Sequence, residues 1–502
     1  MTLEHLDVLV VGAGISGIGA GYHLQRSCPG RTYAILEARE QIGGTWDLFR
    51  YPGIRSDSDM YTLGYSFKPW TSPKAIADGS SILAYLGETA REHGIDRKIR
   101  FGHRVRRASW STADARWTVE VERGEARDPV RLTCNFLFMC SGYYDYAGGY
   151  TPEFPGIERF RGRIVHPQQW TEDVDYAGKR VLVIGSGATA VTLVPEMAKD
   201  AAHVTMLQRS PTYIVSLPGE DPIANWLRRR LPARVAYGIT RWKNVLLGLW
   251  FYRFCRRSPK RARALITRWV QRELGADYDV GTHFNPRYNP WEQRMCLVPD
   301  SDLFRTMREG RASIVTDQIE TFTEKGLRLR SGAELEADLI VTATGLNLLF
   351  LAGLEATVDG ARVDFTKTYN YKGMMFSDVP NLALAIGYTN ASWTLKAELI
   401  CRYVCRLLNH MERTGMRQCT PRLRGSRPEE APFLDLTSGY VQRALDQFPK
   451  QGLQRPWRLH QNYALDLMAL QRGSVEDDVM EFSNPALAAA GDDRPAALVA
   501  AG

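Results

Sequence analysis

Two glycine-rich turns, each between an apolar strand and a helix of small residues, predict an α/β protein with two Rossmann-like dinucleotide-binding domains. The first turn begins at Gly12 and the second at Gly185. A strongly basic, aromatic-rich segment interrupts the second unit, which adds a helical insertion to the prediction. With 502 residues, the chain exceeds the size at which a single hydrophobic core stops growing, so we expect more than one domain.

The first turn has the spacing Gly-x-Gly-x-x-Gly, formed by Gly12, Gly14 and Gly17. The strand Val8 to Val11 precedes it, and a helix and a second strand ending on Glu37 follow it. In such a unit the first glycine allows the tight turn, the second lets backbone N–H groups approach a pyrophosphate, and the third lets the helix pack on the strand. Glu37 can accept a hydrogen bond from a ribose 2′-hydroxyl, so these residues predict a dinucleotide site.

The loop after Glu37 is dense in groups that bond a large polar cofactor and stack on a ring. Gly44, Thr45 and Trp46 lie near its beginning, and Asp57 lies further along. We expect all four to contact the first cofactor.

The second turn has the spacing Gly-x-Gly-x-x-Ala, formed by Gly185, Gly187 and Ala190. The next strand ends just before Arg209, at the place where NAD-specific folds carry an acidic residue. A carboxylate there would repel a 2′-phosphate, whereas a guanidinium can bind it with two charge-assisted hydrogen bonds. The second site is therefore predicted to bind NADPH.

Positive charge is concentrated in one segment. Residues 222–272 contain fourteen Lys or Arg and no Asp or Glu, and removing these fourteen charges from the net +8 leaves −6 for the rest of the chain. Tryptophans alternate with the basic residues on expected helices. Three roles stay open for this insertion: a helical lid or self-association surface, contact with an anionic membrane surface, and nucleic-acid binding, which we disfavour because no groove-reading motif accompanies the charge.

Other features limit the class of protein. No signal peptide is visible at the N-terminus, which favours the cytoplasm, with peripheral membrane association through the basic insertion as the alternative. The eight cysteines include no Cys-x-x-Cys pair and no zinc spacing, so no metal site and no redox dithiol is expected. The longest apolar piece of the insertion is too short to span a bilayer.

The segment Phe160 to Trp170 has the pattern Phe-x-Gly-x-x-x-His-x-x-x-Trp, with His166 at its centre. Together with the loop from Gly43 to Gly64, it resembles the class B flavoprotein monooxygenases, and in particular the Baeyer-Villiger type. The pattern departs from the family at Thr171, where Pro or Asp is usual. The resemblance implies FAD on the first turn and NADPH on the second. From the residues alone, we interpret His166 as a hydrogen-bonded structural histidine, with a relay between domains as the alternative.

The resemblance also implies a reaction. Oxygen adds to reduced flavin at C4a, and the resulting peroxyflavin either inserts one oxygen atom of O2 into a ketone to give an ester, or oxidises a sulfide or thioamide at sulfur. Arg294 lies in the segment that resembles the one holding the family's active-site arginine. Residues Arg55 to Asp57 match the family's Arg-x-Asp motif, and Asp57 is expected to position Arg294. Asp59 is the competing acid. A permanently charged arginine suits the stabilisation of a peroxide anion.

The expected organisation follows from these motifs. The FAD domain is predicted to comprise 1–145 and 343–484, and the NADPH domain 150–216 and 285–342. The basic helical insertion is assigned to 217–284, and a disordered tail to 485–502. A flavin-dependent NADPH oxidase or reductase, or an idle flavoprotein held at a membrane, would share both cofactor sites and remains the alternative function.

Overall fold

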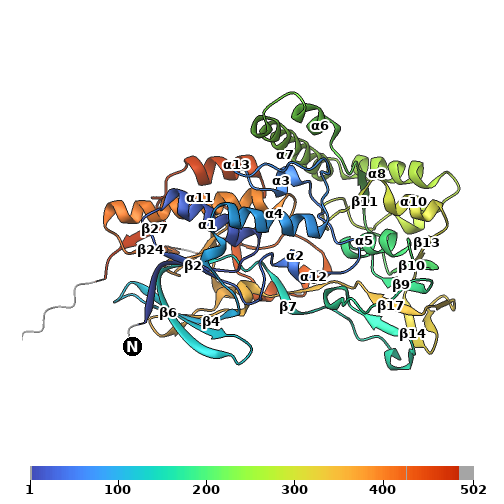
Figure 1. The fold of residues 1–502 in the computed structure, drawn as a ribbon, viewed down its shortest axis with the longest axis horizontal. Coiled ribbons are helices and arrows are strands. Elements are labelled where there is room, and N and C mark those ends of the chain that lie inside the picture. The colour runs from blue at the N-terminus through green and yellow to red at the C-terminus, as the bar shows by residue number, and fades with distance from the viewer. Residues whose placement is uncertain (1–2, 426, 486–502) are drawn as a thin grey trace, which may run out of the picture.

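The computed structural model describes residues 3–425 and 427–485, and within these residues the two largest β-sheets have nine and five strands (Figure 1). The other sheets have two or three strands each. In the larger sheet, β1 pairs in parallel with β2 and β6, while β4, β5 and β6 form an antiparallel meander. Its strands are β1 (Glu4–Val11), β2 (Tyr33–Leu36), β3 (Ile99–Arg100), β4 (His103–Ser111), β5 (Arg116–Arg123), β6 (Asp128–Met139), β19 (Glu355–Val358), β20 (Ala361–Arg362) and β23 (Leu382–Leu384).

Helices cover one face of this sheet: α1 (Ile15–Ser27), α4 (Gly79–Glu92) and α11 (Trp393–Thr414) lie together above it in Figure 1. The carboxyl-terminal parts of its central strands, Val8 to Val11 of β1 and Phe136 to Met139 of β6, are continuous apolar runs and are buried on both faces. The largest core of the molecule therefore forms around β1, next to the first glycine turn.

The smaller sheet is entirely parallel, in the order β13, β10, β9, β17 and β8. Its strands are β8 (Arg163–Val165), β9 (Arg180–Ile184), β10 (His203–Gln208), β13 (Ala312–Thr316) and β17 (Leu339–Thr342), and α5 (Ala188–Met197) and α10 (Asp302–Arg308) pack beside it. Antiparallel strands β14 (Ile319–Thr323), β15 (Gly326–Leu329) and β16 (Glu334–Glu336) extend this half at the right of Figure 1. The predicted fold class, with two Rossmann-like units, is confirmed.

The chain passes twice between the half built on the larger sheet and the half built on the smaller sheet. The two connecting segments, or crossings, pair with each other. Strand β7 (Tyr144–Gly149) runs antiparallel to β18 (Leu346–Leu348). The composition of residues 143–155 predicts only a loop-rich boundary there. The sequence does not predict β7 because its partner β18 lies about 200 residues away, and local composition does not indicate so distant a pairing.

The insertion is helical and consists of α6 (Pro222–Arg228), α7 (Ala233–Arg257), α8 (Pro259–Leu274) and α9 (Val280–His283). It lies between β11 (Ile214–Leu217) and β12 (Cys296–Pro299), which pair in parallel and hold its two ends together. In Figure 1, α6 and α7 form the top of the molecule. No helix in the described part of the chain is long and apolar enough to cross a membrane.

Shorter elements complete the fold. The loop expected from Gly43 to Gly64 contains two one-turn helices, α2 (Thr45–Leu48) and α3 (Met60–Leu63), so the expectation of a plain loop was incomplete. The remaining elements are β21 (Asn370–Tyr371), β22 (Met375–Phe376), β24 (Gln418–Pro421), β25 (Glu430–Pro432), α12 (Gly439–Gln442), β26 (Lys450–Gly452), α13 (Tyr463–Leu467) and β27 (Met480–Ser483). The predicted disordered tail lies outside the described residues from 486 onward.

Candidate active site between the two glycine turns

The first turn is shaped by contacts that only glycine permits. Gly12 has φ of +104°, and a Cβ on it would lie 2.7 Å from the carbonyl oxygen of Cys140. A Cβ on Gly17 would lie 1.8 Å from the carbonyl oxygen of Gly12. Gly14 is the N-cap of α1 and makes no side-chain capping bond. The first backbone N–H groups of α1 are thus left to an anionic ligand, and the turn fits a dinucleotide pyrophosphate.

Gly44 packs directly against Gly14. It has φ of +58°, and a Cβ on it would lie 3.3 Å from the Gly14 Cα. Thr45 begins α2, and Trp46 packs partly buried against the large core. The loop therefore stands beside the first turn, as a cofactor-contacting loop requires.

Glu37 is buried at the end of β2 with 5% exposure. Its carboxylate accepts hydrogen bonds from the backbone N–H of Ala13 at 2.7 Å and of Arg39 at 2.9 Å. Burial raises the pKa of Glu37, and these hydrogen bonds oppose the rise. Each carboxylate oxygen has capacity for a further bond, so the residue can still accept from a ribose hydroxyl.

The second turn repeats this geometry. Gly185 has φ of +137°, and a Cβ on it would lie 2.3 Å from the carbonyl oxygen of Ala343. Gly187 is the N-cap of α5 with open space around it, and Ala190 is fully buried in the helix. Arg209 is exposed immediately after β10, and its side chain has no ion pair or hydrogen bond among the residues that the structure describes. This turn also fits a dinucleotide, with an unpaired guanidinium beside it.

Arg294 and Asp57 meet at the junction of the two halves. The Nη2 atom of Arg294 lies 2.8 Å from the Oδ2 atom of Asp57, and each side chain is about one-third exposed. The Asp57 charge raises the pKa of Arg294 above its ordinary value. Asp59 instead caps α3, accepting from the Thr62 N–H at 3.0 Å and from the Asn244 amide at 2.8 Å. Of the two acids considered, the structure thus pairs Asp57 with Arg294.

Residues near Arg294, in space or in sequence, contact each of the two turns. The Trp393 indole N–H donates to the Ser16 hydroxyl of α1 at 2.8 Å, and the ring centroids of Trp393 and Tyr143 are 5.3 Å apart. On the other side, the Cys296 thiol, two residues beyond Arg294, contacts the Ser186 carbonyl oxygen of the second turn at 3.8 Å. The guanidinium is therefore placed between the two expected cofactor sites.

Three tyrosines lie near enough to this cation for its charge to act on their hydroxyl groups, and sequence reasoning missed them as site residues. They are Tyr143, Tyr144 and Tyr440. Burial raises the pKa of all three hydroxyls, that of Tyr144 to about 12, and the Arg294 charge opposes the rise without cancelling it. Tyr143 follows the carboxyl end of β6, where ligands of α/β sheets bind, and that rule could have identified it. No sequence signal singles out Tyr440.

Sequence comparison finds known proteins that are similar to this chain along nearly its whole length. A flavin-binding monooxygenase-like family model matches residues 58–233, and an NAD(P)-binding Rossmann-like domain matches residues 10–71. The FAD-containing monooxygenase EthA of Mycobacterium tuberculosis is 57% identical, covering 96% of this chain and 98% of that protein. The chain belongs to the flavin-dependent monooxygenases. EthA of Mycolicibacterium smegmatis is 53% identical over 96% of this chain and 97% of its own.

The fold of this monooxygenase is shared with solved structures of low sequence identity. An oxidised steroid monooxygenase bound to NADP has a TM-score of 0.72 at 23% identity, with 96% of this chain and all of that chain covered. An open structure of cyclohexanone monooxygenase has a TM-score of 0.72 at 20% identity with the same coverage. FAD and NADPH are the cofactors of this class, and the two glycine turns fit them.

His166 of the monooxygenase lies at the paired crossings. Its Nε2–H donates to the Gly345 carbonyl oxygen at 3.1 Å, and its Nδ1 accepts from the Gln168 N–H at 3.1 Å. A Cβ on Gly149 would lie 1.9 Å from the imidazole ring, so ring and backbone are in tight contact. Burial lowers the pKa of His166. These contacts agree with the structural interpretation of this histidine.

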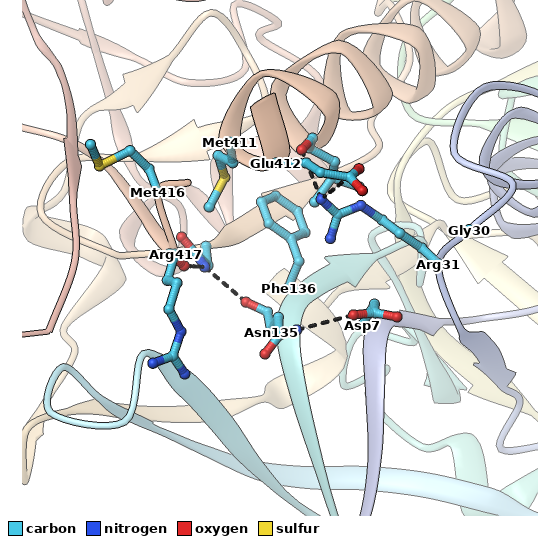
Figure 2. Close-up of a pocket in the computed structure, with 11 residues that line it drawn as sticks. Asp7, Gly30, Arg31, Asn135, Phe136, Met411, Glu412, Met416 and Arg417 are labelled. Carbon is cyan, nitrogen blue, oxygen red and sulfur yellow. Dashed lines mark hydrogen bonds and ion pairs between the residues drawn. The ribbon is translucent and has the colours of Figure 1, made fainter. Parts of the chain in front are cut away.

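One cavity of about 230 Å³ lies away from the candidate site (Figure 2). Its lining includes Asp7 of β1 and Asn135 of β6, joined by a 3.2 Å hydrogen bond, and Arg31 and Glu412 on its other side. Strand β1 leads into the glycine turn at Val11, and Asp7 lies four residues before that end of the strand. The cavity is therefore separate from both dinucleotide sites.

Proposed function

We propose that this monooxygenase inserts one oxygen atom of O2 into ketones to give esters, and oxidises sulfides and thioamides at sulfur. The proposal rests on one observation above all, the Arg294–Asp57 ion pair between the two glycine turns. A site for flavin reduction alone needs no fixed cation at this junction. An oxygen-inserting site does, because negative charge develops there during the reaction.

Each cofactor is assigned to one turn in this proposal. FAD is held at Gly12, Gly14 and Gly17, with Glu37 on its ribose and the loop of Gly44, Thr45 and Trp46 against it. NADPH is held at Gly185, Gly187 and Ala190, and Arg209 binds its 2′-phosphate. The support is the open helix N-terminus at each turn and the unpaired exposed guanidinium beside the second.

Bound FAD supplies the redox chemistry, accepting hydride from NADPH and activating O2 once reduced. The protein's own contribution is charge and position. When an oxygen nucleophile adds to a ketone, negative charge builds on the carbonyl oxygen, and the Arg294 guanidinium stabilises it. Asp57 fixes the guanidinium through its 2.8 Å contact. Attack by a soft sulfur builds less negative charge, so sulfur oxidation depends less on Arg294.

The test compares Arg294→Ala with Arg287→Ala, a control at an exposed arginine of the same segment. Each enzyme is assayed for NADPH consumption, ester from an aryl ketone, and sulfoxide from an aryl methyl sulfide. We expect Arg294→Ala to keep flavin reduction, to lose about 100- to 1,000-fold in ester formation, and to lose less in sulfoxidation. Arg287→Ala should match the wild type.

Two results would reject the proposal. If the wild type converts NADPH and O2 to hydrogen peroxide in stoichiometric amount and forms no product with either substrate, the protein acts as an NADPH oxidase. If Arg294→Ala forms ester at the wild-type rate, the ion pair is structural.

A further inference from the structure

Helix α7 carries an apolar stripe that faces solvent. Its members are spaced by four, three, four and four residues, which places them on one side of a helix. They are Val235, Ile239, Trp242, Leu246 and Trp250, with exposed fractions of 49%, 47%, 43%, 58% and 61%. On the adjoining helix α6, Ile223 and Trp226 are also about half exposed, at 53% and 48%. Large apolar side chains this exposed, and this contiguous, indicate a binding surface.

The same surface is cationic. Arg253 and Arg257 continue the stripe by three and four further residues, and both are exposed. The Arg230 guanidinium lies 4.4 Å from the Trp226 ring centroid. No acidic residue occurs in 222–272, and Asp221 just before it is neutralised by an ion pair with Lys243. An apolar centre with a cationic border is complementary to an anionic, amphiphilic partner.

The opposite side of α7 is fixed to the body of the enzyme. The buried Arg241 donates to the carbonyl oxygens of Tyr61 at 2.8 Å and Gly64 at 2.7 Å, and pairs with Glu398 at 3.3 Å. Asn244 donates to the Asp59 carboxylate at 2.8 Å. Because these bonds orient the helix, the stripe cannot turn inward to bury itself.

Near its C-terminal end, α7 also reaches the candidate active site. The ring centroids of Tyr252 and Trp291 are 5.6 Å apart, and Trp291 precedes Arg294 by three residues. Trp291 has φ of +68°, a strained backbone conformation for a bulky residue, and such strain concentrates at functional sites. One helix therefore joins the exposed surface to the segment that carries Arg294.

We propose that α6 and α7 dock the monooxygenase on the surface of an anionic phospholipid bilayer, with the stripe of α7 inserted between headgroups. Trp at the water–lipid boundary and Arg beside it match the composition of interfacial helices. A second copy of the chain fits less well, because a two-fold interface would bring two cationic surfaces together. Nucleic acid fits less well, because it would leave the Leu and Ile side chains without an apolar partner.

The experiment is flotation of the FAD-loaded, full-length enzyme with vesicles of phosphatidylcholine, with and without phosphatidylglycerol. We expect binding to the anionic vesicles at low salt that weakens as salt is added. Leu246→Glu and Trp250→Glu should each reduce the apparent affinity by about tenfold or more. The double variant Arg253→Glu/Arg257→Glu should do the same through charge.

The matched control is Leu453→Glu, which places the same charge at another exposed leucine, 44% exposed and outside the insertion. It should bind like the wild type, and retained flavin absorbance shows that each variant is folded. Absence of wild-type binding to anionic vesicles at low salt would overturn the proposal, as would equal binding of Leu246→Glu and wild type. Loss of a dimer in Leu246→Glu, without any vesicle binding, would assign the stripe to self-association instead.

Discussion

At the scale of single residues, Asp57 is the clearest test of positioning. Asp57→Asn leaves the Arg294 charge in place but removes the ionic contact that fixes the guanidinium. We expect flavin reduction by NADPH to change less than twofold and ketone oxygenation to fall about 10- to 100-fold, the loss typical of a displaced reacting group. Single-turnover experiments measure the two steps separately: the flavin absorbance follows reduction, and the amount of ester follows oxygenation.

A double variant sharpens this prediction. If Asp57 acts through Arg294, Asp57→Asn should add little to the defect of Arg294→Ala, because the two residues form one unit. Additive losses would show that Asp57 has a separate role.

Arg209 tests the choice between the two nicotinamide cofactors. Arg209→Ala removes an unpaired cation from the expected position of the 2′-phosphate. We expect KM for NADPH to rise about 10- to 100-fold, the value of a charge-assisted hydrogen bond, with KM for NADH unchanged. An unchanged NADPH to NADH preference in steady-state assays would exclude Arg209 from the site.

At the scale of elements, the first strand–turn–helix unit shows what a sequence can specify. Its glycine spacing, apolar strand and terminal acid are local, so the sequence predicts β1, α1 and β2 and the dinucleotide turn between them. The pairing of β7 with β18, and the tyrosines around Arg294, depend on contacts between segments far apart in the chain. Periodicity and composition carry no such information, and for that reason Tyr440 escaped prediction.

The tight packing of that unit leads to a prediction with a matched control. In Gly17→Ala the new methyl group would overlap the Gly12 carbonyl oxygen, whereas Gly30→Ala meets no atom within 4 Å. We expect Gly17→Ala to lose about 1–3 kcal/mol of stability and to retain less FAD after purification. Gly30→Ala should keep the wild-type FAD content. Thermal unfolding and the ratio of flavin to protein absorbance measure both, and full FAD occupancy in Gly17→Ala would contradict the assignment.

At the scale of the whole molecule, His166 makes the stability of the folded protein depend on pH at the paired crossings between the two halves. Burial lowers its pKa in the folded protein below the ordinary value of 6.5, so the folded state favours the neutral ring. As pH falls below about 6.5 the unfolded chain binds the proton first. The contribution of His166 to stability is thus complete above that pH and is lost as pH falls toward the folded pKa.

The corresponding variant is His166→Gln. We expect the wild-type melting temperature to fall more steeply than that of the variant between about pH 7 and pH 5. Parallel curves for the two proteins would mean that His166 does not titrate in this range.

The paired crossings β7 and β18 also limit how the two halves move. A ribbon of two hydrogen-bonded strands bends more easily than it stretches, so a relative motion of the two halves would use this pair as a hinge. Asp57 and Arg294 stand on opposite sides of that hinge, on the loop beside the first turn and on the segment leading into β12. Opening by a few ångströms would break their contact, and closing would restore it. Under the proposed function, the ion pair would therefore hold the guanidinium in position for oxygen transfer only while the two halves stay closed on each other, and so would act as a latch as well as a source of charge.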